Sequence, residues 1–339
     1  MRTRHRTHGV VLVAALALLA AMSSVVESPA GAARPAKGRP VRVGVAYDSA
    51  EISTAWDELA AAGIARAASD YKLTVFDGAS VEGHHSVLTR LARRNLDLVL
   101  AVGFTYADAI ASAAAGYPKT NFVIIDAFPA VSAPNLQDVL FAVNEGSFLV
   151  GAAAGLTSTS LKMGFLGGAQ WHPMMEEFRS GFAAGVAHVA PSATVETAYV
   201  GSFTDPDSAY QMALDMYSSG IDVIYPPAGA SIIGVALAAR DFSAANHKVW
   251  MIGVDHDLYQ QVDDSLKPFV LTSMVKQVDV VTYETIKAQV EGTFVGGVTV
   301  LDLAHAGVNY STLGGFVDDI VPTLEQLRAA IIAGDIVMP

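Results

Sequence analysis

The chain has 339 residues, a length suited to about two domains; 52% are hydrophobic and 16% charged, which permits a sizeable core and excludes global disorder. Its net charge of −12 is opposite in sign to the cationic surfaces that neutralise phosphates, so nucleic acid is excluded as a partner. The absence of cysteine excludes disulfide bonds, thiolate metal sites and cysteine nucleophiles.

Residues 1–33 have the features of an export signal. Three arginines within the first six residues precede an apolar run over residues 10–22, and Ala30, Ala32 and Ala33 provide a small-residue cleavage site. The run of about 13 residues is shorter than the roughly 20 that span a bilayer as a helix, so we expect cleavage; an uncleaved anchor is the alternative. Cleavage removes the three arginines and Glu27 and takes the net charge from −12 to −14. We expect an exported protein in the periplasm or at the extracellular face of the cell membrane, and without a cysteine it is not a lipoprotein.

After a short linker over residues 34–40, apolar segments alternate with helical patterns. The predicted strands cover residues 41–46, 73–76, 98–102, 122–126, 139–143, 163–166, 195–200, 223–225, 249–254, 270–273 and 298–301. Helical spacing of apolar residues predicts helices over residues 56–71, 174–189 and 275–289. Strands that are apolar throughout suit parallel sheets covered on both faces, so the pattern predicts βαβ units in doubly wound sheets.

An aspartate stands at the end of one apolar strand in each half of the chain. These residues are Asp126 and Asp255. Ligands of open parallel sheets bind beyond the carboxyl ends of the strands, so both carboxylates are candidate ligand contacts. The alternative is that each aspartate caps the following helix.

A series of local motifs, in order from about residue 41 to the end, resembles the basic membrane protein family, the PnrA-like substrate-binding proteins of ABC transporters. The matching segments are Gly44–Asp48 (GVAYD), Asn121–Asp126 (NFVIID), Glu145–Gly151 (EGSFLVG), Gly164–Gly168 (GFLGG), Phe178–Phe182 (FRSGF), Gly201–Asp205 (GSFTD), Ile252–Asp255 (IGVD), Leu271–Lys276 (LTSMVK) and Ala333–Pro339 (AGDIVMP).

The resemblance implies a type I periplasmic-binding fold, with two doubly wound parallel-sheet lobes joined by a hinge. The first lobe would comprise residues 41–144 plus 274–296, and the second residues 145–273 plus 297–339. It further implies a binding protein and not an enzyme, which captures a nucleoside or related sugar-bearing molecule in the cleft and delivers it to an ABC permease. No cofactor and no metal are implied.

The same resemblance assigns roles to individual residues. Asp255 and Lys276 would hold the ribose hydroxyls through charge-assisted hydrogen bonds, which are roughly twice as strong as neutral ones. Phe203 would stack on the base, Asp126 would read its polar edge, and Gly229 would let the backbone approach the sugar. Two alternatives stay open: Asp255 and Lys276 form only an inter-lobe ion pair, and Phe203 is only a core residue.

The first loop departs from the family pattern. Relatives carry Asp-Lys-Ser-Phe-Asn where this chain has Asp48 through Ile52, so Glu51 replaces a stacking phenylalanine and Ile52 a base-reading asparagine. We therefore include Asp48, Glu51 and Ile52 among the candidate ligand contacts. Tyr47 or Trp171 could supply the missing aromatic face, although Trp171 also suits a surface loop.

Two other functions stay open at this point. One is a ligand-binding sensory receptor for a signalling partner. The other is a secreted hydrolase of nucleosides or glycosides, which needs two carboxyl groups at a set separation that sequence cannot supply. The histidines of His84-His85 and Asp255-His256-Asp257 lack common zinc-site spacing, so we interpret both segments as polar turns.

Overall fold

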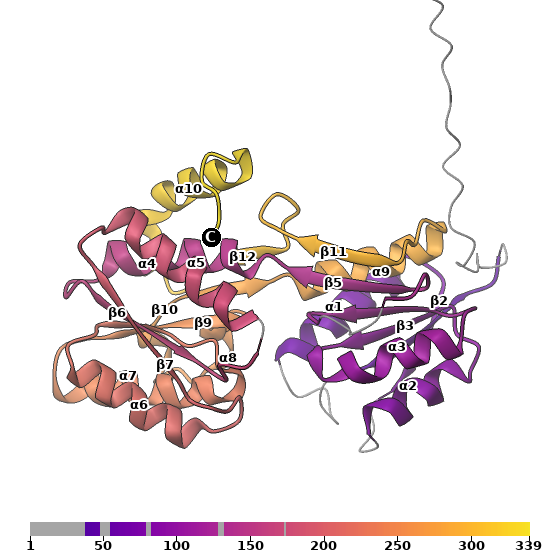
Figure 1. Ribbon diagram of the computed structural model, residues 1–339, viewed down its shortest axis with the longest axis horizontal. Coiled ribbons are helices and arrows are strands. Elements are labelled where there is room, and N and C mark those ends of the chain that lie inside the picture. Colours follow the sequence, from indigo (N-terminus) through magenta and orange to yellow (C-terminus); the bar gives the residue numbers. More distant parts are fainter. Residues whose placement is uncertain (1–37, 48–54, 79–82, 128–131, 173) are drawn as a thin grey trace, which may run out of the picture. The chain divides into compact units, whose positions relative to one another are not determined.

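The computed structural model describes residues 38–47, 55–78, 83–127, 132–172 and 174–339, which form two α/β lobes, each built on a six-stranded sheet (Figure 1). The expected doubly wound architecture is confirmed. All eleven strands expected from the apolar segments are present, with ends shifted by up to three residues. A short strand, β12 (Val308–Tyr310), was not predicted, because three residues carry too little periodicity to recognise.

The first sheet has the strand order β2-β1-β3-β4-β5-β11, and every pairing in it is parallel. Its strands are β1 (Val41–Ala46), β2 (Leu73–Asp77), β3 (Leu98–Val102), β4 (Asn121–Ile125), β5 (Leu136–Phe141) and β11 (Gly297–Leu301). Two helices, α1 (Ala55–Asp70) and α9 (Val278–Glu291), pack together on one face, and α2 (His84–Ala92) and α3 (Ala107–Gly116) cover the other. The central strands β3 and β4 are buried at every residue, which explains their continuous apolar sequence.

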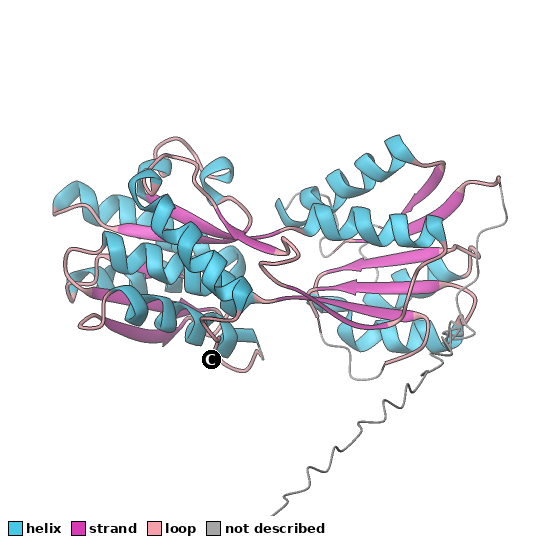
Figure 2. Cartoon of the chain, turned by 90° about the horizontal axis from the view of Figure 1, so that it is seen from above, coloured by secondary structure: helices cyan, strands magenta, loops and turns pink. Residues whose placement is uncertain are grey.

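The second sheet repeats this plan, with the order β7-β6-β8-β9-β10-β12. Only β12 runs antiparallel to its neighbour. The remaining strands are β6 (Lys162–Gly167), β7 (Thr194–Tyr199), β8 (Val223–Tyr225), β9 (Trp250–Asp255) and β10 (Val270–Lys276). The helices are α4 (Val143–Thr157), α5 (Met174–Val189), α6 (Pro206–Ser218), α7 (Ile232–Ala245), the short α8 (Leu258–Gln261) and α10 (Val321–Ala333). Helices lie on both faces of each sheet (Figure 2), which is the doubly wound arrangement.

The chain passes between the two sheets three times. The first passage joins β5 to α4. The second follows Lys276, later than the expected limit near Ser273, because β10 continues to pair with β9 and β12 up to that residue. The third follows Leu301 and not Gly296, because Gly297–Leu301 pairs with β5 as an edge strand of the first sheet. An isolated apolar segment does not reveal its partner strand, so the sequence misplaced these two limits, while the other lobe limits stay a prediction.

Among the described residues, no helix combines the length and apolar character that crossing a membrane requires. The expected export signal at residues 1–33 lies outside the described part of the chain.

Candidate functional site

Asp126 and Asp255 occupy equivalent positions in the two lobes. Because the strand orders match, β4 corresponds to β9, and an aspartate stands at the carboxyl end of each. Both residues adopt the left-handed conformation, with φ of 68° at Asp126 and 69° at Asp255. This conformation is uncommon outside glycine and is enriched at binding and active sites.

The helix-capping alternative is wrong for these two aspartates. The helix that follows β9 is capped by Asp257, whose carboxylate accepts a hydrogen bond from the backbone N–H of Tyr259 at 3.2 Å. Among the described residues, the next element after Asp126 is a strand, β5, so Asp126 caps no described helix.

Lys276 joins both aspartates from the end of β10. Its Nζ donates to Asp126 Oδ2 at 2.7 Å and lies 3.0 Å from Asp255 Oδ1. Asp255 and Lys276 belong to neighbouring strands of the second sheet, whereas Asp126 belongs to the first. The alternative of an inter-lobe ion pair between Asp255 and Lys276 is therefore wrong in one respect: that contact lies within one lobe, and the link between the sheets is made by Lys276 and Asp126.

The Lys276 side chain is 2% exposed, so its charge depends on these partners. Burial alone would lower the pKa of Lys276, but the charges of Asp126 and Asp255 outweigh it and raise that pKa. The rings of Phe178 and Trp56 lie 5.2 Å and 5.4 Å from Nζ and add a cation–π contribution. The Lys276 side chain is thus held between two acidic side chains, one from each lobe.

A cluster of rings lies beside this charged group. The Phe203 centroid is 5.6 Å from that of His172 at an interplanar angle of 80°, and 6.2 Å from that of Trp171 at 90°. Phe104, which follows β3 in the first lobe, is 6.0 Å from Phe203 and 5.1 Å from His172. Phe203 is partly buried, packs against the core of its lobe and also lines a cavity, so its role as a ligand contact stays a prediction.

Two glycines leave the space that Phe203 occupies. A Cβ added at Gly168 would come within 2.4 Å of the Phe203 ring, so only glycine leaves room for it. Gly229 has a positive φ of 57°, and a Cβ there would lie 2.9 Å from the Phe203 carbonyl oxygen. Gly168 follows β6 and Gly229 follows β8, so both act from the carboxyl ends of strands.

Three adjoining cavities of about 280, 370 and 430 Å³ surround the charged group and the rings. All three are lined by Phe104 and Asp126, and the 370 Å³ cavity also by Phe203, Gly229, Asp255 and Lys276. The structure thus brings five residues expected from the sequence around a single hollow, whose size is typical of small-molecule sites.

Other expected contacts are placed differently or fall outside the described residues. Tyr47 is buried in the core and lines none of these cavities, and burial raises the pKa of its hydroxyl to about 12. Trp171 lines the 430 Å³ cavity and is 73% exposed. Asp48, Glu51 and Ile52 lie outside the described residues.

Sequence reasoning missed Phe104 and Trp56 as cavity-lining residues, whereas the pair Trp171-His172 was open between the cleft and a surface loop, and both of its members line a cavity. Phe104 follows Gly103 at the end of β3, so the strand-end argument used for Asp126 applies to it equally. Burial, and then the charge of Lys276, lower the pKa of His172. Its Nδ1 is buried with no hydrogen-bond partner among the described residues.

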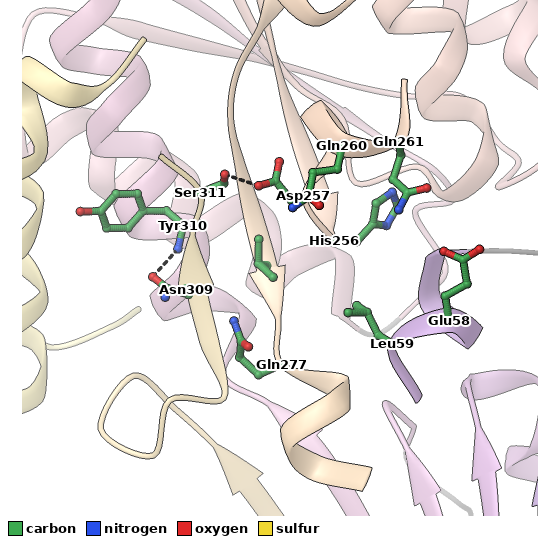
Figure 3. Close-up of a pocket in the computed structure, with 11 residues that line it drawn as sticks. Glu58, Leu59, His256, Asp257, Gln260, Gln261, Gln277, Asn309, Tyr310 and Ser311 are labelled. Carbon is green, nitrogen blue, oxygen red and sulfur yellow. Dashed lines mark hydrogen bonds between the residues drawn. The ribbon is translucent and has the colours of Figure 1, made fainter. Parts of the chain in front are cut away.

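A further hollow of about 370 Å³ is lined by polar side chains of both lobes, including Glu58, His256, Gln261 and Gln277 (Figure 3). The carboxylate of Asp257 there is already engaged by Ser311 Oγ at 2.5 Å. Its phenol ring, Tyr310, is buried, with Arg328 5.3 Å from the ring centroid, and its hydroxyl is bonded to Glu325 at 2.6 Å. The other cavities have more aromatic rings in their lining, so they are the better candidate site for an organic ligand.

The two histidine segments are not simple polar turns. His84 and His85 begin helix α2, and His256 is partly buried between β9 and α8. Within the described ranges, no three His, Asp or Glu side chains are grouped so as to hold a metal ion.

Comparison with known proteins assigns this architecture to a family. Residues 41–339 match the family model Bmp, described as ABC transporter substrate-binding protein PnrA-like. The nucleoside-binding protein BmpA of an ABC transporter from Lactococcus lactis subsp. cremoris is 32% identical over 275 residues, 78% of each chain. The CD4+ T-cell-stimulating antigen of Listeria monocytogenes is 32% identical over 271 residues, 77% of this chain and 75% of that protein.

Solved structures agree with this result. A solute-binding protein of an ABC transporter from Aeropyrum pernix K1 superposes with a TM-score of 0.72 at 26% identity, covering 88% of this chain and 94% of that one. A solute-binding protein from Burkholderia graminis in complex with D-arabinose has a TM-score of 0.61 at 15% identity, covering 85% of this chain and 99% of that one, and shows the fold alone.

Proposed function

Because this chain belongs to the PnrA-like family of ABC-transporter substrate-binding proteins, which are not enzymes, we propose that the small molecule it delivers to its permease is a nucleoside. The observation that carries the proposal is one cavity that is lined by Asp126, Asp255 and Lys276 together with the rings of Phe104 and Phe203. A nucleoside has two parts that match these two kinds of side chain: a sugar with hydroxyl groups and a planar base. The name of the Lactococcus relative supports the same ligand class.

The polar end suits a ribose. Vicinal hydroxyls donate in pairs to a carboxylate such as Asp255, and the Lys276 ammonium donates to hydroxyl or ring oxygens. A ligand without these hydroxyls would leave buried charges without compensation, so discrimination against it should be steep.

The charge balance favours a ligand without phosphate. Two carboxylates face one ammonium, and an added phosphate would bring further negative charge into a poorly solvated site. We therefore expect neutral nucleosides to bind and nucleoside monophosphates to bind weakly.

Capture couples to closure of the two lobes. Phe203, Asp255 and Lys276 belong to the second lobe, whereas Phe104 and Asp126 belong to the first. A ligand that contacts both groups stabilises the closed state, because it gains contacts there that the open state does not offer.

A thermal-shift panel tests the proposal. The purified protein is heated with adenosine, inosine, guanosine, uridine, cytidine, ribose and adenosine monophosphate. A ligand present at about 100 times its Kd stabilises the folded state by about 2.7 kcal/mol, so at least one nucleoside should raise the melting temperature by more than ribose or the monophosphate does. If no nucleoside shifts the melting temperature at millimolar concentration, the ligand is of another class.

A further inference from the structure

Phe104 presents an aromatic ring to the cavity from the lobe opposite to Phe203. It is 37% exposed, which is unusual for a phenylalanine, and it lines all three cavities around the charged group. The residue begins a short 3₁₀ turn, Phe104–Tyr106, at the carboxyl end of β3. Gly103 before it has a φ of 104°, a conformation that turns the chain sharply out of the strand.

The two phenylalanines link the lobes at the aromatic end of the cavity. Their centroids are 6.0 Å apart and their planes are tilted by 53°, so the rings contact each other without stacking in parallel. His172 lies edge to face against both rings, at 76° to Phe104 and 80° to Phe203. Lys276 and Asp126 make the corresponding inter-lobe contact at the polar end, 2.7 Å apart.

A planar base fits between these rings once their planes turn from the present 53° tilt toward parallel and their spacing grows. Carbon atoms in contact lie about 3.5 Å apart, so a base stacked on both faces needs a separation of about 7 Å between the two phenylalanines. The present spacing is shorter by about 1 Å, and hinge motion between lobes commonly supplies changes of this size. Tyr47 does not line the cavity, and Trp171 meets Phe203 edge to face, so neither offers a face as suitably placed as that of Phe104.

We propose that Phe104 is a specificity-determining residue of this site, stacking on the face of the ligand's heteroaromatic ring opposite to Phe203. The inference rests on the proposed nucleoside function and names a residue that holds the base. It predicts that Phe104 contributes to the affinity for ligands with a ring and contributes nothing to the affinity for the sugar alone.

Calorimetric titration of wild type, Phe104→Leu, Phe104→Tyr and Phe76→Leu shows whether Phe104 contributes to the affinity for the base or for the sugar. Phe76 is the matched control, a partly buried first-lobe phenylalanine that lies between Arg42 and Arg94 and lines none of the three cavities. The ligands are inosine, adenosine, guanosine and uridine, with methyl β-D-ribofuranoside as the probe that lacks a base.

Phe104→Leu should weaken nucleoside binding by about 10- to 100-fold, the range found for loss of one base-stacking ring. Phe104→Tyr keeps the ring and should stay within about threefold of wild type, as should Phe76→Leu. The affinity for the methyl riboside should be equal in all four proteins.

Two outcomes overturn the inference in different ways. If wild type and Phe104→Leu bind nucleosides equally well, Phe104 does not hold the base although the nucleoside function stands. If wild type binds none of the four nucleosides, the proposed function fails and this assignment fails with it.

Discussion

Asp126 and Asp255 mirror each other across the two lobes: each ends the equivalent strand of its sheet, each has a φ close to 70°, and each carboxylate meets the ammonium of Lys276. Left-handed backbone at a residue with a side chain costs free energy, and the surrounding structure must supply it. The same left-handed backbone conformation occurs in both lobes, and one carboxylate from each lobe lies next to the ammonium of Lys276. This arrangement is the basis of the predictions that follow.

Replacing Asp255 with asparagine should weaken ribonucleoside binding by about 10- to 100-fold. Hydrogen bonds to charged groups contribute about 1.5–3 kcal/mol, and the amide loses the charge while keeping the shape. Calorimetry with a ribonucleoside and its 2′,3′-dideoxy analogue checks the cause. Wild type should prefer the ribonucleoside strongly, and the variant should lose most of that preference. Equal discrimination by both proteins would remove Asp255 from the sugar contact.

Replacing Lys276 with methionine should destabilise the protein by about 3–5 kcal/mol at pH 7.5. The change leaves the buried Asp126 carboxylate and the partly exposed Asp255 carboxylate near each other without their cation. Like charges and burial raise the pKa of such carboxyl groups above the unfolded value, so the missing stability should return as the pH falls and protons bind. Urea unfolding at pH 5 and pH 7.5 measures the free energy of unfolding of the variant and of wild type. If the variant is less stable than wild type by the same amount at both pH values, the unpaired charges are not the cause.

Replacing Asp138 with asparagine should stabilise the protein at pH 7.5 and leave it unchanged near pH 4. This carboxyl in β5 is 4% exposed, and burial raises its pKa to about 6. Because the folded-state pKa exceeds the unfolded one, the wild type loses stability as the pH rises from about 4 to about 6, by up to about 2–3 kcal/mol. The variant does not titrate and should show a flatter pH dependence of the unfolding free energy. A parallel dependence in both proteins would contradict the raised pKa.

Replacing Gly168 with alanine should weaken nucleoside binding while changing stability little. The new methyl group would meet the partly buried Phe203 ring, which borders the cavity and has to shift to make room, so we expect the change to displace the ring more than the core. Equilibrium unfolding and calorimetry together separate the two effects. Tyr47→Phe is a suitable control, because Tyr47 lines none of the three cavities and the variant should bind like wild type. Unchanged affinity in Gly168→Ala would mean that Phe203 is not held in its working position by this contact.

The sequence predicted the parts of the site that depend on local position. Strand-end reasoning found Asp126 and Asp255, and the same argument would have found Phe104 had it been applied to β3. Family resemblance alone pointed to Lys276, since nothing about a lone lysine after an apolar strand indicates a buried cation. Its contact with Asp126 could not be predicted, because it joins residues 150 positions apart through the placement of one sheet against another.

The limits of the lobes were harder to predict for a related reason. β11 is an alternating edge strand with Val298 and Val300 exposed, and its sequence does not distinguish a partner in the first sheet from one in the second. The first loop, where Glu51 and Ile52 replace the family's phenylalanine and asparagine, stays a prediction as the source of this protein's own specificity.

Calorimetric titration of the purified protein with inosine, adenosine, guanosine, uridine and free ribose tests directly whether its ligand is a nucleoside. We expect saturable binding of one molecule per chain for at least one nucleoside. That nucleoside should bind more tightly than ribose by a factor of about 10 or more, since stacking adds about 1–3 kcal/mol. Ribose binding as tightly as every nucleoside, or no binding of any nucleoside at millimolar concentration, would contradict it.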